Sequence, residues 1–288
     1  ARWEEVHGEE PDVLLSDPNF VVSSAFPFAG QRLYFPRPMV GRSDISYRAA
    51  KRLKDVAFVG QDVFGKICAG RSIEWDQGEL GSALYPAPSG GTPWERLERP
   101  RVGVDRTSSA SNVFYSPAVR FAENCRENCG LYFLAHCAGK EKLREKFEAV
   151  LTLLGERGLG GLRSYGYGAF DWDRISFSFD LPESNYGVCL SLLSPDQREV
   201  ENGLLDGARY QLEDRGGYIH SRGATPYRRK TVRMLTEGSI VRTGGKRVAG
   251  RVRDVTPEEL PPGTTLDHPV YRFGRALTVP YQLREENI

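Results

Sequence analysis

The chain has 288 residues, of which 40% are hydrophobic and 27% charged, and its 39 Lys and Arg residues against 38 Asp and Glu residues give a formal net charge of +1. This apolar content can bury a sizeable core, which excludes wholesale disorder, and no stretch approaches the roughly 20 consecutive apolar residues of a membrane-spanning helix. The balanced charge excludes a uniformly basic nucleic-acid-binding protein, although it allows a local basic patch.

The cysteines and the start of the sequence indicate a compartment. Five cysteines, an odd number, argue against a disulfide-stapled fold in a chain of this length. The start, Ala1–Glu5, has neither the basic nor the apolar stretch of a signal peptide. We therefore expect an intracellular, cytoplasmic protein. Because the chain opens without Met and partway into a helical pattern, we also expect residues upstream of Ala1.

The first part of the chain alternates between extended and irregular segments. Residues 1–8 have the pattern of the end of an amphipathic helix, and residues 13–35 are predicted to be extended and aromatic-rich. Residues 40–128 are predicted to form a long irregular insertion with a short helical patch at 46–54. Within it, residues 85–93 have the Pro and Gly content of a loop. Such an insertion in a compact domain usually carries function or disorder.

Regular structure is predicted again further along the chain. The apolar run 131–134 has the length of a strand. Residues 140–157 carry Leu and Phe at helical spacing up to Gly158, which is expected to end the helix. Alternating aromatic residues then predict a strand over 170–179. Strand, helix, glycine loop and strand are the second half of a ferredoxin-like βαββαβ unit.

A second unit of the same kind is predicted to follow. Its strands are expected over 188–193, 210–220, 231–241 and 270–279, with a helix near 195–205. The predicted fold class is therefore α+β, with two ferredoxin-like, RRM-type domains and the long insertion in the first. The predicted domains are residues 1–182 and 183–288.

The balanced total charge hides a basic block in the second domain. Residues 215–253 contain eleven Lys or Arg residues and one acid, Glu237, whereas residues 1–19 contain six acids and one base. A block of this sign attracts polyanions. Tyr218 and Tyr227 interleave with the bases, as base stacking requires. A solvated, arginine-rich hairpin surface is the alternative interpretation.

The most informative segment runs from Gly158 to Gly168 and holds five glycines in eleven residues. Glycines let a backbone turn freely and approach a ligand closely, and exposed N–H groups in such a loop bind phosphate. Arg163 adds a fixed cation, and Tyr165 and Tyr167 offer flat faces to bases. The alternative is a helix C-cap followed by a flexible turn.

Two common nucleotide-binding motifs do not fit this loop. A Rossmann fingerprint needs a third glycine where Arg163 stands and opens a helix, whereas this loop follows one. A P-loop needs Gly-Lys-Ser/Thr, which the segment lacks. The loop therefore belongs to neither kind of site.

The spacing of the loop, Gly-hydrophobic-Gly, five residues, Gly-hydrophobic-Gly, resembles the glycine-rich loop of RAMP proteins, the ferredoxin-fold RNA binders of CRISPR systems. Further segments, in order along nearly the whole chain, resemble the fourth subunit of the type III-A Csm effector complex, a Cas five-like RAMP protein. These segments are 23–28, 33–38, 51–54, 104–106, 215–218, 231–239 and 268–274. The family's opening strand, with its His-Ser-Asp-type segment, has no counterpart here, so no RNA contact is assigned to it.

The resemblance implies a non-catalytic RNA-binding subunit without a cofactor. Such a subunit would hold the repeat-derived 5′ handle of the crRNA and contact the large polymerase-like subunit and the first backbone RAMP subunit, in a complex that targets invading transcripts. A thumb-like hairpin in the insertion is expected to kink the RNA and to fall within Phe64–Arg106. The cap subunit of a type III-B complex is an alternative.

Candidate RNA contacts come from the glycine loop, the basic block and the thumb region. Loop glycines would allow backbone approach, Arg163 and Ser164 would bind phosphate oxygens, and Asp105 and Arg106 could orient one another, with an ordinary surface ion pair as the alternative. Phe26 and Phe28 are expected in the core rather than as base stackers. The predicted RNA-binding residues are Gly158, Gly160, Gly161, Arg163, Ser164, Tyr165, Gly166, Tyr167, Gly168, Asp105, Arg106, Arg215, Arg228, Arg229 and Lys230.

Catalysis would have to rest on a histidine. Of His7, His136, His220 and His268, only His220 lies in the basic region, where a general acid or base could act on RNA. A lone histidine without a positioned partner is more often a hydrogen-bonding group, so we expect no catalytic residue and no enzyme activity. A RAMP endoribonuclease that processes crRNA with His220 is the alternative.

Metal binding would have to rest on Cys125, Cys129 and Cys137, with His136. Their spacing is unlike that of common zinc knuckles, so we expect reduced thiols and no metal. The acidic first residues are expected to face a neighbouring protein, because acid near RNA is unfavourable.

Overall fold

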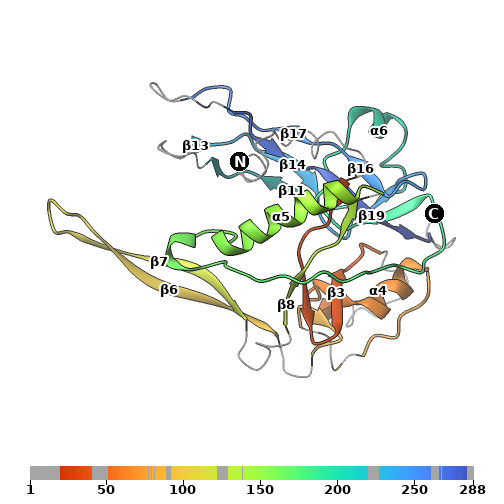
Figure 1. Ribbon diagram of the computed structural model, residues 1–288. Helices are drawn as coiled ribbons and strands as arrows, with labels where there is room; N and C mark the ends of the chain where they lie inside the picture. Colours follow the sequence, from red (N-terminus) through yellow and green to blue (C-terminus); the bar gives the residue numbers. More distant parts are fainter. Residues whose placement is uncertain are drawn as a thin grey trace. The chain divides into compact units, whose positions relative to one another are not determined.

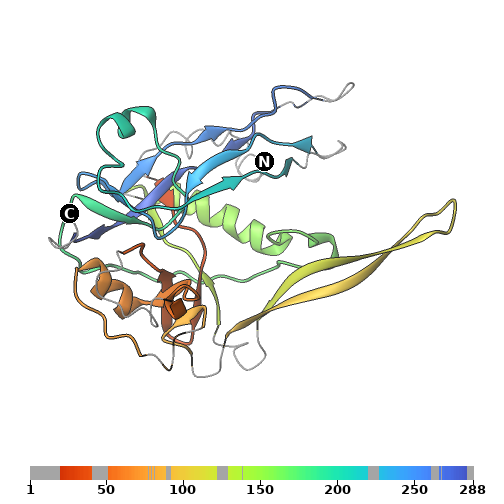
Figure 2. The same cartoon turned by 180° about the vertical axis from the view of Figure 1, so that it is seen from behind.

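The computed structural model (Figures 1 and 2) describes residues 20–40, 51–76, 78, 80, 82–88, 92–121, 129–137, 139–219, 227–260, 266 and 268–283. These residues divide into two compact units: unit 1 holds the described residues of 20–24 and 134–283, and unit 2 those of 25–133. Many short strands and a few helices make up both, which confirms the α+β class. The boundary at residues 182 and 183 stays a prediction.

A five-stranded sheet forms the body of unit 2. Its elements in chain order are β2 (Phe26–Ala29), β3 (Arg32–Pro36), β4 (Phe58–Gly60), α4 (Gln61–Cys68), β5 (Leu84–Tyr85) and β8 (Cys129–Tyr132). The strand order is β5-β4-β3-β2-β8, with β4 and β5 parallel and the other neighbours antiparallel. Gly30, at φ +59°, supplies the left-handed residue of the tight turn between β2 and β3.

The core of unit 2 is aromatic. Phe26, Tyr34 and Phe35 are buried, and the Phe35 ring stacks on Phe64 of α4 with ring centroids 4.7 Å apart. Burial of one such ring contributes about 1.5–3 kcal/mol to stability. Phe26 therefore packs in the core, as expected, and Phe28 on the same strand is half-buried.

A long hairpin of β6 (Trp94–Val104) and β7 (Ser111–Phe121) extends from the rest of unit 2 (Figure 1). Its antiparallel register runs without a break from the Trp94–Phe121 pair to the Val104–Ser111 pair. The prediction that residues 40–128 are irregular is wrong here, and also at β4, α4 and β5. Because most side chains of the hairpin are exposed, its sequence carries no alternation of apolar and polar residues that would mark strands.

The two faces of this hairpin differ in chemistry. Side chains alternate between faces along each strand, and one face carries Arg99 and Arg101, with Phe114 opposite Arg101. The other face carries Arg96 and Glu98 but is otherwise mostly apolar and exposed. Its large hydrophobic residues are Val102, Val104, Val113, Tyr115 and Val119, each more than half exposed.

The first elements of unit 1 are β1 (Phe20–Val22), β9 (Ala135–Cys137) and α5 (Glu141–Arg157). The two strands pair antiparallel, and α5 packs on them through Leu143 and through Phe147, whose ring meets Phe20 edge-on at 5.2 Å. The predicted helix over 140–157 is confirmed. The predicted strand at 131–134 lies partly in β8, and residues 133–134 join β8 to β9.

Residues 169–184 contain no strand, so the predicted strand over 170–179 is wrong. The segment is extended, but its alternate residues contact successive turns of α5 instead of a neighbouring strand. Phe170 N–H donates to Gly155 O (3.2 Å), Trp172 Nε1 donates to Thr152 Oγ1 (3.3 Å), and Arg174 Nη1 pairs with Glu148 Oε1 (2.9 Å). In the first half of the predicted strand, alternate residues therefore contact a helix and not a neighbouring strand.

The C-terminal part of unit 1 is built on a four-stranded sheet and three two-stranded ladders. The sheet order is β15 (Ile240–Arg242), β10 (Tyr186–Cys189), β19 (Arg275–Tyr281), β16 (Val248–Gly250), and the short helix is α6 (Gln197–Glu201). The ladders are β11 (Leu212–Arg215) with β14 (Val232–Leu235), β12 (Tyr218–Ile219) with β13 (Tyr227–Arg228), and β17 (Arg253–Asp254) with β18 (Tyr271–Arg272). Strands are confirmed in each predicted strand region, and α6 confirms the predicted helix at shorter length.

Some predictions lie outside the described residues. These are the helix over 1–8 and the first part, residues 46–50, of the predicted helical patch. In the described part of that patch, residues 51–53 are helical. None of the helices in the described part of the chain has the length and apolar character needed to span a bilayer.

Candidate nucleic-acid interface

The neck of the glycine loop is closed by backbone contacts at the end of α5. Gly158 follows the helix at φ +76°, and the N–H of Leu159 donates to Gly168 O at 2.8 Å. A Cβ on Gly168, which has φ +78°, would lie 2.0 Å from Leu159 O, and one on Gly158 would lie 2.7 Å from Tyr167 O. Gly158 and Gly168 are therefore required by packing of the loop itself.

The tip of the loop is open. A Cβ on Gly160, Gly161 or Gly166 would meet no atom within 4 Å. The N–H groups of Gly160 and Gly161 donate to no acceptor within the described part of the chain. Arg163 is exposed and begins the short 3-10 turn η2 (Arg163–Tyr165). The tip therefore presents unused backbone donors and one cation to solvent, which is the chemistry that binds an anion.

The aromatic residues of the loop differ in exposure. The Tyr165 side chain is 67% exposed, whereas Tyr167 is half-buried. Leu162 adopts a left-handed φ of +57°, a conformation that costs about 1–2 kcal/mol for a residue with a Cβ. Its carbonyl oxygen accepts from Tyr165 N–H at 2.9 Å, which fixes the turn. The predicted loop residues are thus gathered on one protruding turn, and only the Ser164 side chain lies outside the described atoms.

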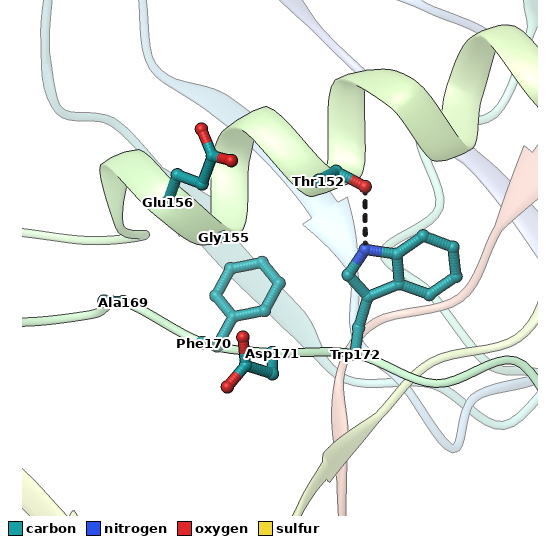
Figure 3. A pocket seen from close by; sticks show the side chains of 7 residues that line it. All are labelled: Thr152, Gly155, Glu156, Ala169, Phe170, Asp171 and Trp172. Carbon is teal, nitrogen blue, oxygen red and sulfur yellow. Dashed lines mark hydrogen bonds between the residues drawn. The ribbon is translucent and has the colours of Figure 1, made fainter.

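A pocket of about 550 Å³ lies beside the neck, between α5 and residues 169–172 (Figure 3). The carboxylates of Glu156, on the helix, and Asp171, on the facing segment, both line it (Figure 3). Its lining residues are Thr152, Gly155, Glu156, Ala169, Phe170, Asp171 and Trp172. Because the charged side chains in this lining are both acidic, the pocket is unsuited to a phosphate group and is not part of the interface.

The basic block over 215–253 is partly neutralised, because five of its eleven bases pair with acids that come from outside it. The ion pairs are Arg215–Glu213 (2.9 Å), Lys230–Glu258 (3.0 Å), Arg233–Asp214 (2.8 Å), Arg242–Asp206 (3.4 Å) and Arg251–Asp196 (3.1 Å). The hydrogen bond and charge of Arg233 lower the pKa of Asp214. The local field is therefore weaker than the eleven bases of the block suggest, because tertiary structure brings acids to them.

The predicted contacts in the β12–β13 ladder are partly engaged. The Arg228 guanidinium lies over the Tyr218 ring at 5.7 Å, and its Nε donates to Tyr218 Oη at 3.3 Å, a hydrogen bond that raises the pKa of Arg228. Arg229 donates twice to Gly216 O, from Nε at 3.1 Å and from Nη2 at 2.7 Å. Their role in RNA binding stays a prediction. Residues 220–226, with His220, lie outside the described residues.

Asp105 and Arg106 stand at the tip of the β6–β7 hairpin. Asp105 Oδ1 accepts from the N–H groups of Ser108 (2.9 Å) and Thr107 (2.7 Å), and these hydrogen bonds lower its pKa. In the described part of the chain, no ion pair joins Asp105 to Arg106. The expectation that they orient one another is therefore wrong, and Asp105 acts as a turn residue.

Cys68 and Cys189 are buried, free thiols. Burial, followed by the charge of Glu237, raises the pKa of Cys189 to about 12, and burial also raises the pKa of Cys68. Such thiols are inert at neutral pH. Cys129 and Cys137 are half-buried, and Cys125 lies outside the described residues. Among the residues that the structure describes, no group of three or more His, Cys, Asp or Glu side chains could hold a metal ion.

Known proteins resemble the chain along most of its length. Residues 182–281 match the family described as the CRISPR Csm4 C-terminal domain. The CRISPR system Cms protein Csm4 of Thermococcus onnurineus (strain NA1) is 27% identical over 279 residues, which cover 92% of this chain and 81% of that protein. The protein of the same name from Methanocaldococcus jannaschii is 29% identical over 184 residues, 56% of this chain and 46% of that protein.

Solved structures share the fold. A chain from the crystal structure of the Csm3-Csm4 subcomplex in the type III-A CRISPR-Cas interference complex has a TM-score of 0.63 and 17% identity, covering 98% of this chain and 90% of that one. A chain from the crystal structure of a Csm1-Csm4 cassette in complex with cA4 has a TM-score of 0.61 and 22% identity, covering 99% and 88%. The resemblance predicted from the glycine loop and its accompanying segments is therefore confirmed: the chain is similar to Csm4 proteins along most of its length, and its fold is that of Csm4-containing structures.

Proposed function

We propose that this chain is a non-catalytic, RNA-binding subunit of a type III-A CRISPR effector complex and that it anchors the 5′ handle of the crRNA. The observation that carries this proposal is the open tip of the glycine loop. Gly160 and Gly161 offer unused N–H donors there, and Arg163 offers an exposed cation. A single-stranded handle is held by such phosphate contacts together with stacked bases, and Tyr165 is exposed for stacking.

Arg163 has a particular task in this arrangement. The loop follows the C-terminus of α5, where the helix dipole disfavours an anion, and Glu156 and Asp171 lie on either side of the nearby pocket. A phosphate at the tip therefore needs a compensating positive charge. Arg163 supplies it in a planar geometry that suits two phosphate oxygens.

Assembly with protein partners is the second part of the proposal. Two of the similar structures are a Csm1-Csm4 cassette and a Csm3-Csm4 subcomplex. By analogy, this chain would join a large polymerase-like subunit to a backbone RAMP subunit, in the cytoplasm. Its contribution is to position the guide, and the chemistry of target destruction belongs to other subunits.

The proposed architecture is two ferredoxin-like, RAMP-type domains with a thumb in the first. The β6–β7 hairpin is the candidate thumb, because it protrudes from unit 2 and overlaps the predicted range 64–106, although it continues to Phe121. Arg99 and Arg101 on one face would approach the RNA backbone. The exposed valines of the other face could wedge between bases and kink the strand.

Filter binding of a single-stranded RNA with the repeat-derived 5′ segment tests the anchoring. Arg163→Glu is expected to weaken binding at low salt by about tenfold or more, because it replaces an attraction by a repulsion. Arg198→Glu, on the exposed surface of α6, is the matched control for charge reversal and should leave affinity nearly unchanged. Equal affinities for both variants and the parent chain would contradict the proposal.

Two further readouts separate the alternatives. Incubation with a crRNA precursor should leave the RNA intact, whereas cleavage that depends on His220 would make the chain an endoribonuclease. Purification of the native assembly should recover guide RNA with type III-A subunits. Recovery with type III-B subunits instead would assign the chain to the cap of that complex.

A further inference from the structure

Three segments of unit 1 lie side by side near Arg272. The N–H of Lys230 donates to Val255 O at 3.0 Å, and the N–H of Val255 donates to Val270 O at 2.7 Å. The first bond connects the segment after β13 to the segment after β17. The second connects the segment after β17 to the segment before β18. Residues 227–230, 253–255 and 270–272 therefore form one continuous surface.

The β11–β14 ladder turns Arg215 toward the same surface. Arg215 pairs with Val232, so its side chain shares a face with Met234, two residues further along β14. Met234 is fully buried, and its Cε lies 3.3 Å from the position that a Cβ on Gly274 would take. The face that carries Arg215 is thus directed at the segment of Arg272 and Gly274.

Arg229 is fixed beside these residues. Its Nε and Nη2 both donate to Gly216 O, and a Cβ on Gly217 would lie 3.1 Å from Nη2. The guanidinium therefore lies against the bare backbone of Gly217, which has φ +137°. Within the described part of the chain, its Nη1 donates to no acceptor.

The positive charges of these arginines are only partly balanced. The side chain of half-buried Arg272 makes no hydrogen bond or ion pair within the described residues. Burial lowers the pKa of Arg272, and the charges of Arg229 and then Arg215 lower it further. The charges of Glu237 and Glu213 raise it. Glu237 already accepts from Ser24 Oγ, and Glu213 pairs with Arg215 at 2.9 Å.

Arg215 also has an unused donor. Its Nε is buried and has no hydrogen-bond partner among the described residues, and an unpartnered buried donor of a charged group is costly. The charges of Arg229 and Arg215 act on Arg272, and each of the three guanidiniums has a donor without an acceptor among the described residues, so an anion that accepts several hydrogen bonds at once would stabilise them. A phosphate group, with its several oxygens, fits this need better than a single carboxylate, and arginine forks match its geometry.

We propose that Arg215, Arg229 and Arg272 form a phosphate-binding subsite on unit 1 that takes a phosphate group of bound RNA. The inference rests on the proposed RNA-binding function and adds to it a second anchoring point, with Arg272 as a contact outside the basic block. Arg228 and Lys230 are not assigned to this subsite, because neither is among the charges that act on Arg272, and their side chains contact Tyr218 and Glu258.

The test measures RNA affinity of the full chain as a function of salt, with a single-stranded RNA that carries the repeat-derived 5′ segment. Arg272→Gln should weaken binding by about tenfold, and it should reduce the slope of log affinity against log salt by about 0.7, the value for one contact on a single strand. Arg272→Lys should recover part of the slope. Arg233→Gln, which removes a cation paired with Asp214 on the opposite face of the ladder, is the matched control and should change neither quantity.

Two RNAs that differ at the 5′ end show whether the bound phosphate is internal or terminal. An equal loss with 5′-hydroxyl and 5′-phosphate RNA indicates an internal phosphodiester, and a loss confined to the 5′-phosphate RNA indicates the terminal group. If Arg272→Gln lowers the thermal midpoint strongly, Arg229→Gln and Arg215→Gln carry the same test from other strands.

Failures of the two proposals are distinguishable. If the Arg272, Arg229 and Arg215 variants bind with unchanged affinity and salt slope while Arg163→Glu weakens binding, the subsite is wrong and the anchoring function stands. If the parent chain binds no RNA, both are wrong.

Discussion

The glycine loop and the basic strands of the C-terminal region both suit RNA, but they differ in how many of their donors and cations are already bound within the protein. At the loop tip the donors are backbone N–H groups with no acceptor among the described residues, and Arg163 is exposed. In the basic strands, five of the cations are already paired with acids. The number of positive residues in a segment therefore overstates its affinity for RNA. A segment with a single cation can offer more groups that have no partner within the protein.

The largest expected effect is on the neck of the loop. Gly168→Ala places a Cβ 2.0 Å from Leu159 O at a φ of +78°, so it should destabilise the fold by about 2 kcal/mol or more. That lowers the thermal midpoint by about 2–4 °C per kcal/mol for a chain of this size. Gly161→Ala, at the open tip, is the control and should change stability by less than about 0.5 kcal/mol. Equal melting temperatures for the two variants would show that neck and tip do not differ as described.

The next effect separates binding from folding at the tip. Gly161→Asp adds a carboxylate where a side chain meets no atom within 4 Å, so the fold should be kept while a bound phosphate is repelled. RNA affinity should fall by about tenfold at low salt, and the deficit should shrink as salt screens the charge. Gly161→Asn, of equal size and neutral, should lose much less. A loss for the two variants that is the same at all salt concentrations would point to steric exclusion instead of charge.

A smaller effect is expected in the basic strands. Lys230→Gln removes a cation that already pairs with Glu258 at 3.0 Å. Its net field on RNA is therefore partly cancelled, and affinity should fall by only about twofold. Glu258→Gln releases Lys230 and should raise affinity slightly in the same filter-binding titration. A tenfold loss for Lys230→Gln would place this lysine directly on the RNA and remove the contrast with the loop.

The smallest effect concerns the ion pair on the exposed face of the β11–β14 ladder. Arg233 lowers the pKa of Asp214 below its usual 3.8, so the stability from this pair is present above the unfolded-state pKa and is lost as the pH falls through the folded-state pKa. The difference in thermal midpoint between the parent chain and Arg233→Gln should be small at neutral pH and should vanish in acid. A difference that grows on acidification would contradict this.

The sequence predicts those parts of the fold in which one face is buried against one neighbour. The spacing of Leu143, Phe147 and Leu151 predicts α5 because that side of the helix packs inward. Glycine content predicts the loop at 158–168, but it does not separate Gly168, which packing requires, from Gly161, which is free of contacts. That distinction depends on atoms brought close by folding.

Other features follow from tertiary structure and leave no local pattern. The β6–β7 hairpin is exposed on both faces, so no hydrophobic period marks it. In the segment 170–179, alternate residues 170, 172 and 174 contact α5, so the pattern there resembles that of a strand. Arg272 lies outside the basic block and meets Arg229 and Arg215 only because the strands around Val255 bring them together.

Hydrogen–deuterium exchange of the loop, with and without the handle RNA, tests the central claim most directly. Amides of exposed, unbonded groups exchange fast, and a bound phosphate would slow them. The account predicts strong protection across Gly160–Arg163 on RNA binding, and little change in α6 as an internal reference. Tight RNA binding that leaves exchange across Gly160–Arg163 unchanged would contradict it.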